Sequence, residues 1–280
     1  MNDSITQVLA EAKQQLVSSK TKALDAEILL AHILEVSRDY LFACPERIFT
    51  VTEVDKSTNL IKRRAYGEPI AYIINRKEFW SLTLTVTPDT LIPRPETELL
   101  IEIGLQLLAK EEAHKIADLG TGSGAIALAM AKEFPHSQIT AIDNSLAALK
   151  IAETNALDLN IKNVKFSLSD WGEALEVKEY DMILTNPPYI DADDSCLNDS
   201  EICFEPRCAL VAENRGMEAI HKIAKQARKH LRSGGYLLIE HGSTQGKEVR
   251  ETLEKFKYKN ITTVKDLLKL ERVTFAVMVG

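Results

Sequence analysis

The stretch 117–131, ADLGTGSGAIALAMA, decides the fold of this chain of 280 residues. The apolar residues before the glycines are typical of a strand, and the alanine-rich run after them is typical of a helix. Glycines at such a turn let the backbone approach a ligand and direct the N-terminus of the helix at it. The stretch therefore predicts a strand–turn–helix unit whose turn, residues 120–124, binds a ligand.

The next predicted strand, QITAID, ends in Asp143, 23 residues after Gly120. A carboxylate at this place accepts the hydroxyl groups of a ribose, which favours a nucleoside cofactor over a glycine turn needed only for packing. Gly120, Gly122 and Ala125 also match the looser dinucleotide-binding pattern, so a nicotinamide cofactor and S-adenosylmethionine both fit this segment. Gly124 stands where a small side chain would cover an adenosyl-amino acid, and this favours S-adenosylmethionine.

Short apolar runs and helical segments alternate after residue 113: the runs are KIADL, QITAID, NVKFSL, YDMILT and YLLIEH. This alternation predicts a doubly wound, mostly parallel sheet. The last two runs, YKNITTVKD and ERVTFAVMV, are too close together for a helical crossover and predict two antiparallel strands at the edge of the sheet. Trp171, after the third strand, could lie against an adenine ring, although a tryptophan there is more often part of the core.

Residues 4–66 show the spacing of apolar residues that is typical of amphipathic helices. Thr21 is a good N-cap for one helix, and Asp39 and either Thr50 or Thr52 could begin two more. We therefore expect a small helical domain at the N-terminus.

The pattern becomes strand-like over residues 70–87. The runs IAYII and FWSLTLTV predict a hairpin that turns around Asn75–Lys77, and asparagine tolerates the left-handed backbone of such a turn. Three prolines within 88–95 then predict a stiff, extended connection into a helix that begins near Glu96.

The amino-acid composition excludes several classes of protein. The net charge is −7, and residues 1–85 hold 11 basic and 11 acidic residues, so neither half has the basic excess of a protein that grips a nucleic-acid backbone. No apolar run is long enough to span a membrane and the N-terminus is unlike a signal peptide, so we expect a cytoplasmic protein without membrane contact. The four cysteines include no C-x-x-C pair, so we expect no metal site.

The run YDMILT leads directly into Asn186, Pro187, Pro188 and Tyr189. Proline cannot continue the ladder of a strand, so a stiff loop begins at Asn186. In a doubly wound sheet, ligands bind at the carboxyl ends of the strands where the strand order reverses, here between the first and fourth alternating strands. We therefore expect Asn186 beside the glycine loop. His241, after a later strand, could line the same crevice, but we favour a packing role for it.

This motif suits a planar NH₂ group, whose nitrogen is a poor nucleophile because its lone pair is delocalised. The side-chain oxygen of Asn186 and the backbone carbonyl of Pro187 could each accept one N–H, which would orient the nitrogen and raise its electron density. The prolines fix the backbone, and Tyr189 provides a ring for the planar group to lie against. The alternative is a strand cap with a proline turn and a core tyrosine.

These motifs resemble those of the protein-(glutamine-N5) methyltransferases that modify peptide chain release factors, the HemK family. The resemblance covers almost the whole chain, in the segments GEPIAYIINRKEFW (67–80), LIPRPETELL (91–100), DLGTGSGAIALAMA (118–131), NPPYI (186–190), FEPRCAL (204–210) and IEHGSTQ (239–245). Asn-Pro-Pro-Tyr alone is shared with DNA, RNA and other protein methyltransferases. The chain departs from the family at DLLKLERV (266–273), where we expect consequences for a loop rather than for activity.

The resemblance implies an α/β, class I S-adenosylmethionine-dependent methyltransferase fold: a Rossmann-like sheet of seven strands, the last one antiparallel, with a small helical N-terminal domain. It implies methylation, by S-adenosyl-L-methionine, of the side-chain nitrogen of the glutamine in the GGQ motif of class I release factors, which modulates translation termination. The cofactor-binding residues that it implies are Gly120, Thr121, Gly122, Ser123, Gly124, Asp143, Trp171 and Asn186. The implied catalytic residues are Asn186, Pro187 and Tyr189, and the implied substrate-binding residues are Asn186, Pro187, Pro188 and Tyr189.

We expect residues 1–70 to dock the release factor, residues 71–95 to form a hairpin and a proline-rich linker, and residues 96–280 to form the methyltransferase domain. We also expect a monomer that contacts no nucleic acid directly. The alternative activity is methylation of an amino group of DNA or RNA by the same motif, and the net charge of −7 counts against it. A non-catalytic module that binds S-adenosylmethionine is a third interpretation, whereas a nicotinamide oxidoreductase would leave Asn186–Tyr189 without a role.

Overall fold

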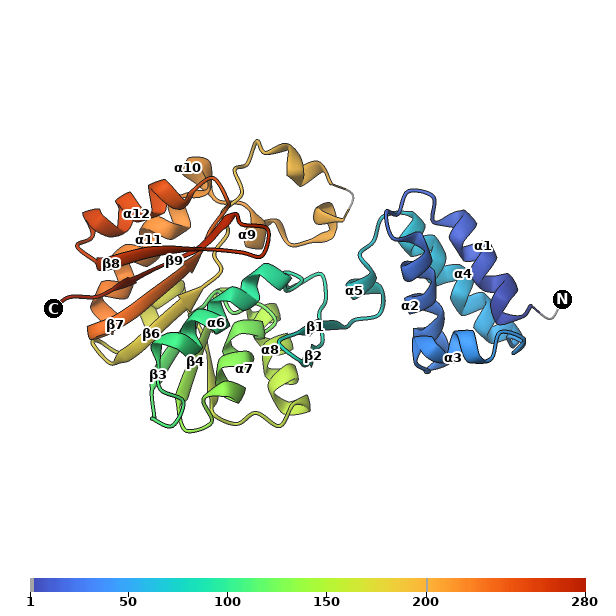
Figure 1. Cartoon of the computed structure of the whole chain (residues 1–280), viewed down its shortest axis with the longest axis horizontal. Coiled ribbons are helices and arrows are strands. Elements are labelled where there is room, and N and C mark those ends of the chain that lie inside the picture. The colour runs from blue at the N-terminus through green and yellow to red at the C-terminus, as the bar shows by residue number, and fades with distance from the viewer. Residues whose placement is uncertain (1–2, 200) are drawn as a thin grey trace. The chain divides into compact units, whose positions relative to one another are not determined.

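Two units make up the part of the chain that the computed structural model describes, residues 3–199 and 201–280. Unit 1 is Met1–Arg76 together with Asn198–Phe204, and unit 2 is Lys77–Leu197 together with Glu205–Gly280. Figure 1 shows the helices of unit 1 and the sheet of unit 2. Unit 1 thus includes a short segment that follows the Asn-Pro-Pro-Tyr motif in the sequence. No helix among the described residues has the length and apolar composition needed to cross a membrane.

Unit 1 is built from helices. They are α1 (Ile5–Gln15), α2 (Lys22–Leu34), α3 (Arg38–Ala43), α4 (Val51–Ala65) and the short α5 (Ile70–Ile73). Thr21 immediately precedes α2, as predicted, and Thr50 rather than Thr52 begins α4 with a capping box. The expectation for α3 was wrong by two residues, because Ser37 and not Asp39 is its N-cap.

A buried arginine ties the segment 198–204 to the helices of unit 1. The guanidinium of Arg64 lies 2.6 Å from a carboxylate oxygen of Asp25 on α2 and 2.6 Å from one of Glu201. The ring of Phe204 also packs edge-on against that of Tyr66, with 6.5 Å between the ring centres. Since a buried guanidinium is costly without partners, these two carboxylates are required where Arg64 lies.

The prediction of a strand at IAYII was wrong. Residues Ile70–Ile73 form α5. Ile70, Ile73 and the C-cap residue Ile74 follow helical spacing and all pack against the apolar core of unit 1. Packing therefore outweighs the β-propensity of this run. Asn75 does have a left-handed backbone, with φ of 51°, but its turn connects α5 to the strand β1 (Lys77–Phe79).

The hairpin turns later than predicted. β1 pairs with β2 (Leu82–Leu84), and Phe79 lies opposite Leu82, so that Trp80 and Ser81 form a two-residue turn. Both turn residues have positive φ, 49° and 55°, as a tight turn matched to the twist of a hairpin requires. The buried faces of Phe79, Leu82 and Leu84 join the core of unit 2.

The main sheet of unit 2 confirms the predicted seven strands. They are β3 (Lys115–Leu119), β4 (Gln138–Asp143), β5 (Val164–Leu168), β6 (Tyr180–Thr185), β7 (Leu231–Glu240), β8 (Lys259–Lys265) and β9 (Glu271–Val277), in the spatial order β5-β4-β3-β6-β7-β9-β8. β3 to β7 are parallel, and β9 is antiparallel to both β7 and β8. The strand order reverses at β3, which pairs with β4 on one side and with β6 on the other.

Helices cover both faces of this sheet, as Figure 1 shows. One apolar cluster packs α6 (Glu98–Leu107), α7 (Ala125–Glu133) and α8 (Leu146–Asp158) against one face, and a second packs α11 (Glu218–His230) and α12 (Gly246–Lys255) against the other. Neighbouring residues of β6 alternate between the clusters: Met182 and Leu184 belong to the first and Ile183 to the second. This alternation is what a strand buried on both faces requires.

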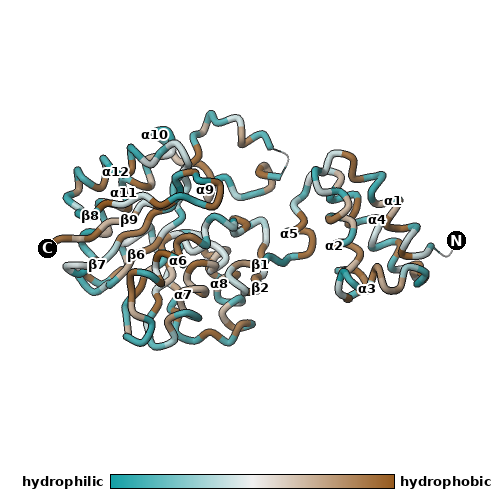
Figure 2. The backbone as a smooth tube through the Cα atoms, in the orientation of Figure 1, coloured by the Kyte–Doolittle hydropathy of each residue, from teal (hydrophilic) through white to brown (hydrophobic). Residues whose placement is uncertain are grey.

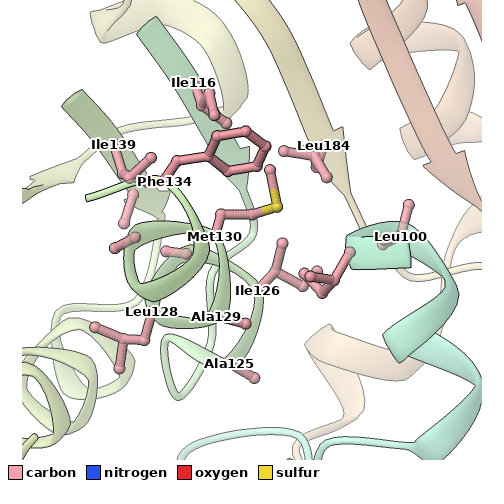
Figure 3. Packing of buried hydrophobic residues seen from close by; sticks show 14 of the residues in the cluster. Leu100, Ile116, Ala125, Ile126, Leu128, Ala129, Met130, Phe134, Ile139 and Leu184 are labelled. Carbon is pink, nitrogen blue, oxygen red and sulfur yellow. The ribbon is translucent and has the colours of Figure 1, made fainter. Parts of the chain in front are cut away.

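The helices differ in how deeply they are buried. In α7 every residue from Ala125 to Ala131 is buried, whereas in α12 the charged residues of one side remain in solvent. The colouring of Figure 2 is accordingly hydrophilic along most of α12. Figure 3 shows Phe134, just after α7, and Met130 directed toward Ile116 and Leu184 of the sheet.

We predict that Phe134→Ala destabilises unit 2 by about 3–5 kcal/mol, because it leaves a cavity beneath the sheet where Phe134 is now fully buried. Urea unfolding followed by tryptophan fluorescence measures this loss, since Trp80 and Trp171 both belong to unit 2. Leu157→Ala, at an exposed position of α8, is the control and should change the free energy of unfolding by less than about 0.5 kcal/mol. Equal losses in the two variants would contradict the assignment of Phe134 to the core.

Candidate functional site

A cavity opens at the carboxyl ends of β3, β4, β5 and β6, where the strand order reverses. Its lining includes the predicted site residues Gly120, Gly122, Asp143, Trp171, Asn186 and Pro188. The lining also includes residues 89–91, in the loop before α6, and Pro206, Cys208 and Ala209, at the short helix α9 (Arg207–Leu210). Six predicted residues that are distant in the sequence therefore meet around one space. Among the described residues, Thr121, Ser123, Gly124, Pro187 and Tyr189 are not part of this lining.

Gly122 and Gly124 are each required in this loop, but for different structural reasons. Gly122 has φ of +54°, and nothing lies within 4 Å of the place a Cβ would take, so its backbone faces open space. Gly124 has φ of +86°, and a Cβ there would lie 3.1 Å from Leu128 and 3.2 Å from Ala152. Gly124 is thus needed for the close packing of α7 on α8, whereas Gly122 leaves room for a ligand at the backbone.

Asp143 organises the loop from the end of β4. One of its carboxylate oxygens accepts the N–H of Gly122 at 2.8 Å, and the other accepts the N–H of Ser145 at 2.9 Å. Each oxygen of a carboxylate can accept more than one hydrogen bond, so Asp143 keeps acceptor capacity toward the cavity. The ring of Trp171 lies beside Gly120, 3.4 Å from the place that a Cβ would take there.

A second carboxylate, Asp118, lies fully buried beneath the loop. Its Oδ2 accepts the hydroxyl of Thr121 at 2.7 Å and the N–H of Ala127 at 3.1 Å, while Oδ1 has no hydrogen-bond partner among the described residues. Burial raises the pKa of Asp118 to about 7, only partly offset by those two hydrogen bonds. Asp118 holds the first turn of α7 to the loop and carries an unused acceptor.

Asn155 of α8 braces the same loop from outside. Its side-chain nitrogen donates to the carbonyls of Ser123 and Thr85 at 2.8 and 3.0 Å, and its oxygen accepts the N–H of Thr85 at 2.7 Å. This buried amide therefore joins the glycine loop to the end of the β1–β2 hairpin. Nothing in the local sequence around Asn155 indicates this contact.

The side chain of Asn186 has a defined orientation. Its Nδ2 donates to the hydroxyl oxygen of Thr97 at 3.1 Å. Oδ1 of the same amide, a hydrogen-bond acceptor, is thereby directed away from Thr97. Asn186 begins its loop directly after Thr185, whose hydroxyl donates to the carbonyl of Leu119 on β3 at 2.7 Å.

Tyr189 is held at both its backbone and its side chain. Its carbonyl accepts the side-chain N–H of Gln245 at 2.9 Å, and a Cβ on Gly216 would lie only 2.0 Å from that oxygen. Its hydroxyl donates to Oε1 of Glu240, the last residue of β7, at 3.4 Å. Burial, and then the charge of Glu240, raise the pKa of Tyr189, so its hydroxyl stays protonated.

Two residues of this site, Thr97 and Glu240, were not predicted from the sequence. Glu240 adjoins His241, which was considered for the crevice. His241 is instead fully buried, with its ring nitrogens paired to the carbonyl of Gly242 and the hydroxyl of Thr274, as a packing residue. The available signal was the position of Glu240 at the carboxyl end of a buried strand.

A further ion pair fixes the proline-rich segment near the cavity. Arg94 pairs with Glu205, and the other oxygen of Glu205 accepts the N–H of Ile92 at 3.1 Å. Residues of the segment LIPRPETELL and Glu205 of the segment FEPRCAL, which lie far apart in the sequence, are thus bound to each other within unit 2. Among the described residues, no group of three or more histidine, cysteine, aspartate or glutamate side chains is arranged to hold a metal ion.

Comparisons with known proteins agree with these observations. Residues 7–74 match the family described as PrmC N-terminal domain, and residues 96–201 match the family described as Methyltransferase small domain. The chain is 48% identical to the release factor glutamine methyltransferase of Coxiella burnetii, and the match covers 98% of both proteins. It is 45% identical to the release factor glutamine methyltransferase of Escherichia coli, over 95% of this chain and 96% of that protein.

Solved structures share the fold at lower identity. A methyltransferase from Pyrococcus furiosus is 19% identical and superposes with a TM-score of 0.55, over 80% of this chain and 100% of that one. The 16S rRNA N2 G1207 methyltransferase of T. thermophilus, solved with AdoMet and guanosine, is 21% identical with a TM-score of 0.53, over 72% of this chain and 49% of that one. At such identities the likeness concerns the fold.

The burial of Asp118 predicts a dependence of stability on pH. With a pKa of about 7, the folded protein keeps a proton on Asp118 that the unfolded chain, with an ordinary pKa of 3.8, releases. The contribution of Asp118 to the free energy of unfolding therefore falls as the pH rises from about 4 to about 7. Asp118→Asn has no proton to release, so we expect it to gain stability relative to the wild type between about pH 5 and pH 8. Urea unfolding at both pH values measures this, and a difference that stays constant with pH would contradict it.

Proposed function

The chain belongs to the family of release factor glutamine methyltransferases, and we propose that it transfers a methyl group from S-adenosyl-L-methionine to the side-chain amide nitrogen of a glutamine in a peptide chain release factor. Its fold is that of a class I methyltransferase, an α/β sheet of seven strands with a helical N-terminal region. One observation carries the proposal. Asn186 stands beside the glycine loop with its amide nitrogen bound to Thr97, and its oxygen remains as an acceptor.

The residues of the cavity fit S-adenosylmethionine. Asp143 has acceptor capacity for the hydroxyls of a ribose, and Trp171 offers a flat ring at the same wall. Gly122 leaves its backbone open to the cavity. When bound, this cofactor supplies an electrophilic methyl group carried by a sulfonium.

We propose that Asn186 and Pro187 hold the amide that receives the methyl group. An amide nitrogen carries two hydrogens, and Oδ1 of Asn186 and the carbonyl of Pro187 each accept one of them. The two acceptors orient the nitrogen and raise its electron density as positive charge develops there. No strong base is needed before the methyl group arrives, because the nitrogen can lose its proton afterwards. Pro188 stiffens the loop, and the partly buried ring of Tyr189 supports it.

The release factor also needs a surface to dock on, and we propose that unit 1 supplies it. Residues 7–74 match the PrmC N-terminal domain, and unit 1 exposes large apolar side chains, including Phe42 and Val51, which are 61% and 79% exposed. The target glutamine is proposed to be that of the GGQ motif of class I release factors, and its methylation to modulate termination in the cytoplasm. The enzyme is proposed to act as a monomer without direct contact to nucleic acid.

The test of the proposed function offers labelled S-adenosylmethionine and the full-length enzyme a purified release factor, DNA and RNA in parallel. We expect transfer to the release factor. Transfer to DNA or RNA alone would replace the proposal by the alternative activity, in which the same residues hold a base.

We predict that Asn186→Ala lowers kcat by about 10²–10³, as the loss of a preorganised polar group at a reacting centre does elsewhere. A merely structural Asn186 would instead cost roughly 1 kcal/mol of stability with little effect on turnover. Single-turnover transfer to the release factor, with cofactor binding measured by calorimetry, separates the two. Asn186→Ala acting at the wild-type rate would refute the role.

The docking role predicts a separate effect. Phe42→Ser combined with Val51→Ser should raise the KM for the release factor several-fold and leave kcat nearly unchanged, because the catalytic groups lie in unit 2. Leu157→Ser, an exposed leucine of unit 2, is the matched control and should leave both constants unchanged. A KM equal to that of the wild type in the double variant would remove these side chains from the docking surface.

A further inference from the structure

A buried carboxyl group lies behind the residues that would hold the substrate. Glu240 ends β7 and is almost fully buried, with Oε1 accepting the hydroxyl of Tyr189 at 3.4 Å. Its second oxygen, Oε2, is buried without a partner at ordinary hydrogen-bond geometry in the described part of the chain. Glu240 therefore has acceptor capacity that local packing does not use.

Thr97 connects this carboxyl group to Asn186. Its hydroxyl oxygen accepts the Nδ2–H of Asn186 at 3.1 Å, and Thr97 also lies near enough to Glu240 to lower the pKa of that carboxyl group. A hydroxyl group has one proton to donate. While Thr97 accepts from Asn186 on one side, its own proton is free for a carboxylate on the other.

We propose that Glu240 and Thr97 are positioning residues that set the polarity of the substrate clamp, formed by Asn186, Pro187 and Tyr189. As the common acceptor, Glu240 draws the protons of Thr97 and Tyr189 toward itself. Thr97 can then only accept from Asn186, which turns Oδ1 of Asn186 toward the substrate. The inference rests on the proposed function, because it explains why the clamp presents acceptors alone to an NH₂ group.

The reverse polarity would disable the clamp. If Thr97 donated to Oδ1 of Asn186, the NH₂ group of Asn186 would face the NH₂ group of the substrate, and two donors would meet. The same conflict would arise if the hydroxyl of Tyr189 pointed toward the substrate. A buried acceptor shared by the hydroxyls of Thr97 and Tyr189 prevents both of these unfavourable arrangements. It therefore accounts for a carboxyl group at a position where burying an apolar residue would cost less free energy.

Protonation of Glu240 should weaken this arrangement. Burial raises the pKa of Glu240 to about 7, while Thr97, Arg272 and Tyr189 lower it and Glu96 raises it. A protonated carboxyl group can itself donate to Thr97 or Tyr189, so the acceptor-only clamp is complete when Glu240 is ionised. We therefore expect kcat to rise with pH through about 7, and this rise to be absent from Glu240→Gln.

The direct test compares Thr97→Val with Thr97→Ser in the full-length enzyme. Valine keeps the shape and removes the hydroxyl group, so we expect kcat to fall at least about tenfold, whereas serine keeps the hydroxyl and should retain kcat within about threefold. Thr252→Val, which removes an equally buried hydroxyl from α12, is the matched control and should leave kcat unchanged (Thr97 and Thr252 are 3% and 4% exposed). Thr97→Val with the kcat of the wild type would overturn the proposal.

A second readout does not depend on turnover. Nitrogen-15 NMR of the side-chain amide of Asn186, assigned by the signal that is missing from Asn186→Ala, reports its hydrogen bond to Thr97. Hydrogen exchange of this amide should be faster in Thr97→Val and Glu240→Gln than in the wild type and Thr97→Ser. Unchanged exchange in both variants would overturn the proposal. A wild-type enzyme that methylates no release factor would refute the proposed function, while the exchange rates would still decide the polarity of Asn186.

Discussion

The parallel pairing of β3 with β6 is the constraint on which the rest of unit 2 depends. In its register Leu119 lies opposite Thr185, and the hydroxyl of Thr185 donates to the carbonyl of Leu119. The next residue on each strand, Gly120 and Asn186, therefore leaves the sheet at the same edge. A slip of one residue would send the side chains of either strand to the opposite face and separate the glycine loop from the motif. The site follows from strand pairing before any ligand is considered.

Acidic groups are buried at two places behind this edge, and both are costly. Asp118 lies under the glycine loop and Glu240 under Tyr189, and burial raises the pKa of each to about 7. Each also keeps one oxygen without a partner among the described residues. Carboxyl groups placed only for stability would be fully paired. Their position suggests that unit 2 gives up some stability to fix the direction of hydrogen bonds around its cavity.

The sequence was sufficient to predict those features that depend on one contiguous stretch of residues. The glycine turn, the proline stop at Asn186 and the strand alternation each predicted their element, and together they predicted the sheet. Two kinds of feature were missed. IAYII was misread because its β-branched residues suit a strand, while contacts with unit 1 decide that it is a helix. Thr97 and Glu240 were missed because the role of each depends on its contact with a residue far away in the sequence, and only the folded sheet brings these residues together.

The central claim is that a clamp of hydrogen-bond acceptors presents an amide nitrogen for methylation. The position of the added methyl group tests it most directly. Fragmentation mass spectrometry of a release factor treated with the wild-type enzyme should locate one added methyl group on the side-chain nitrogen of a glutamine. A methyl group on a carboxylate oxygen, on a lysine or on a nucleic-acid base would contradict the account, because none of these combines the planar geometry of an amide in a protein with the two hydrogens that Asn186 and Pro187 are proposed to accept.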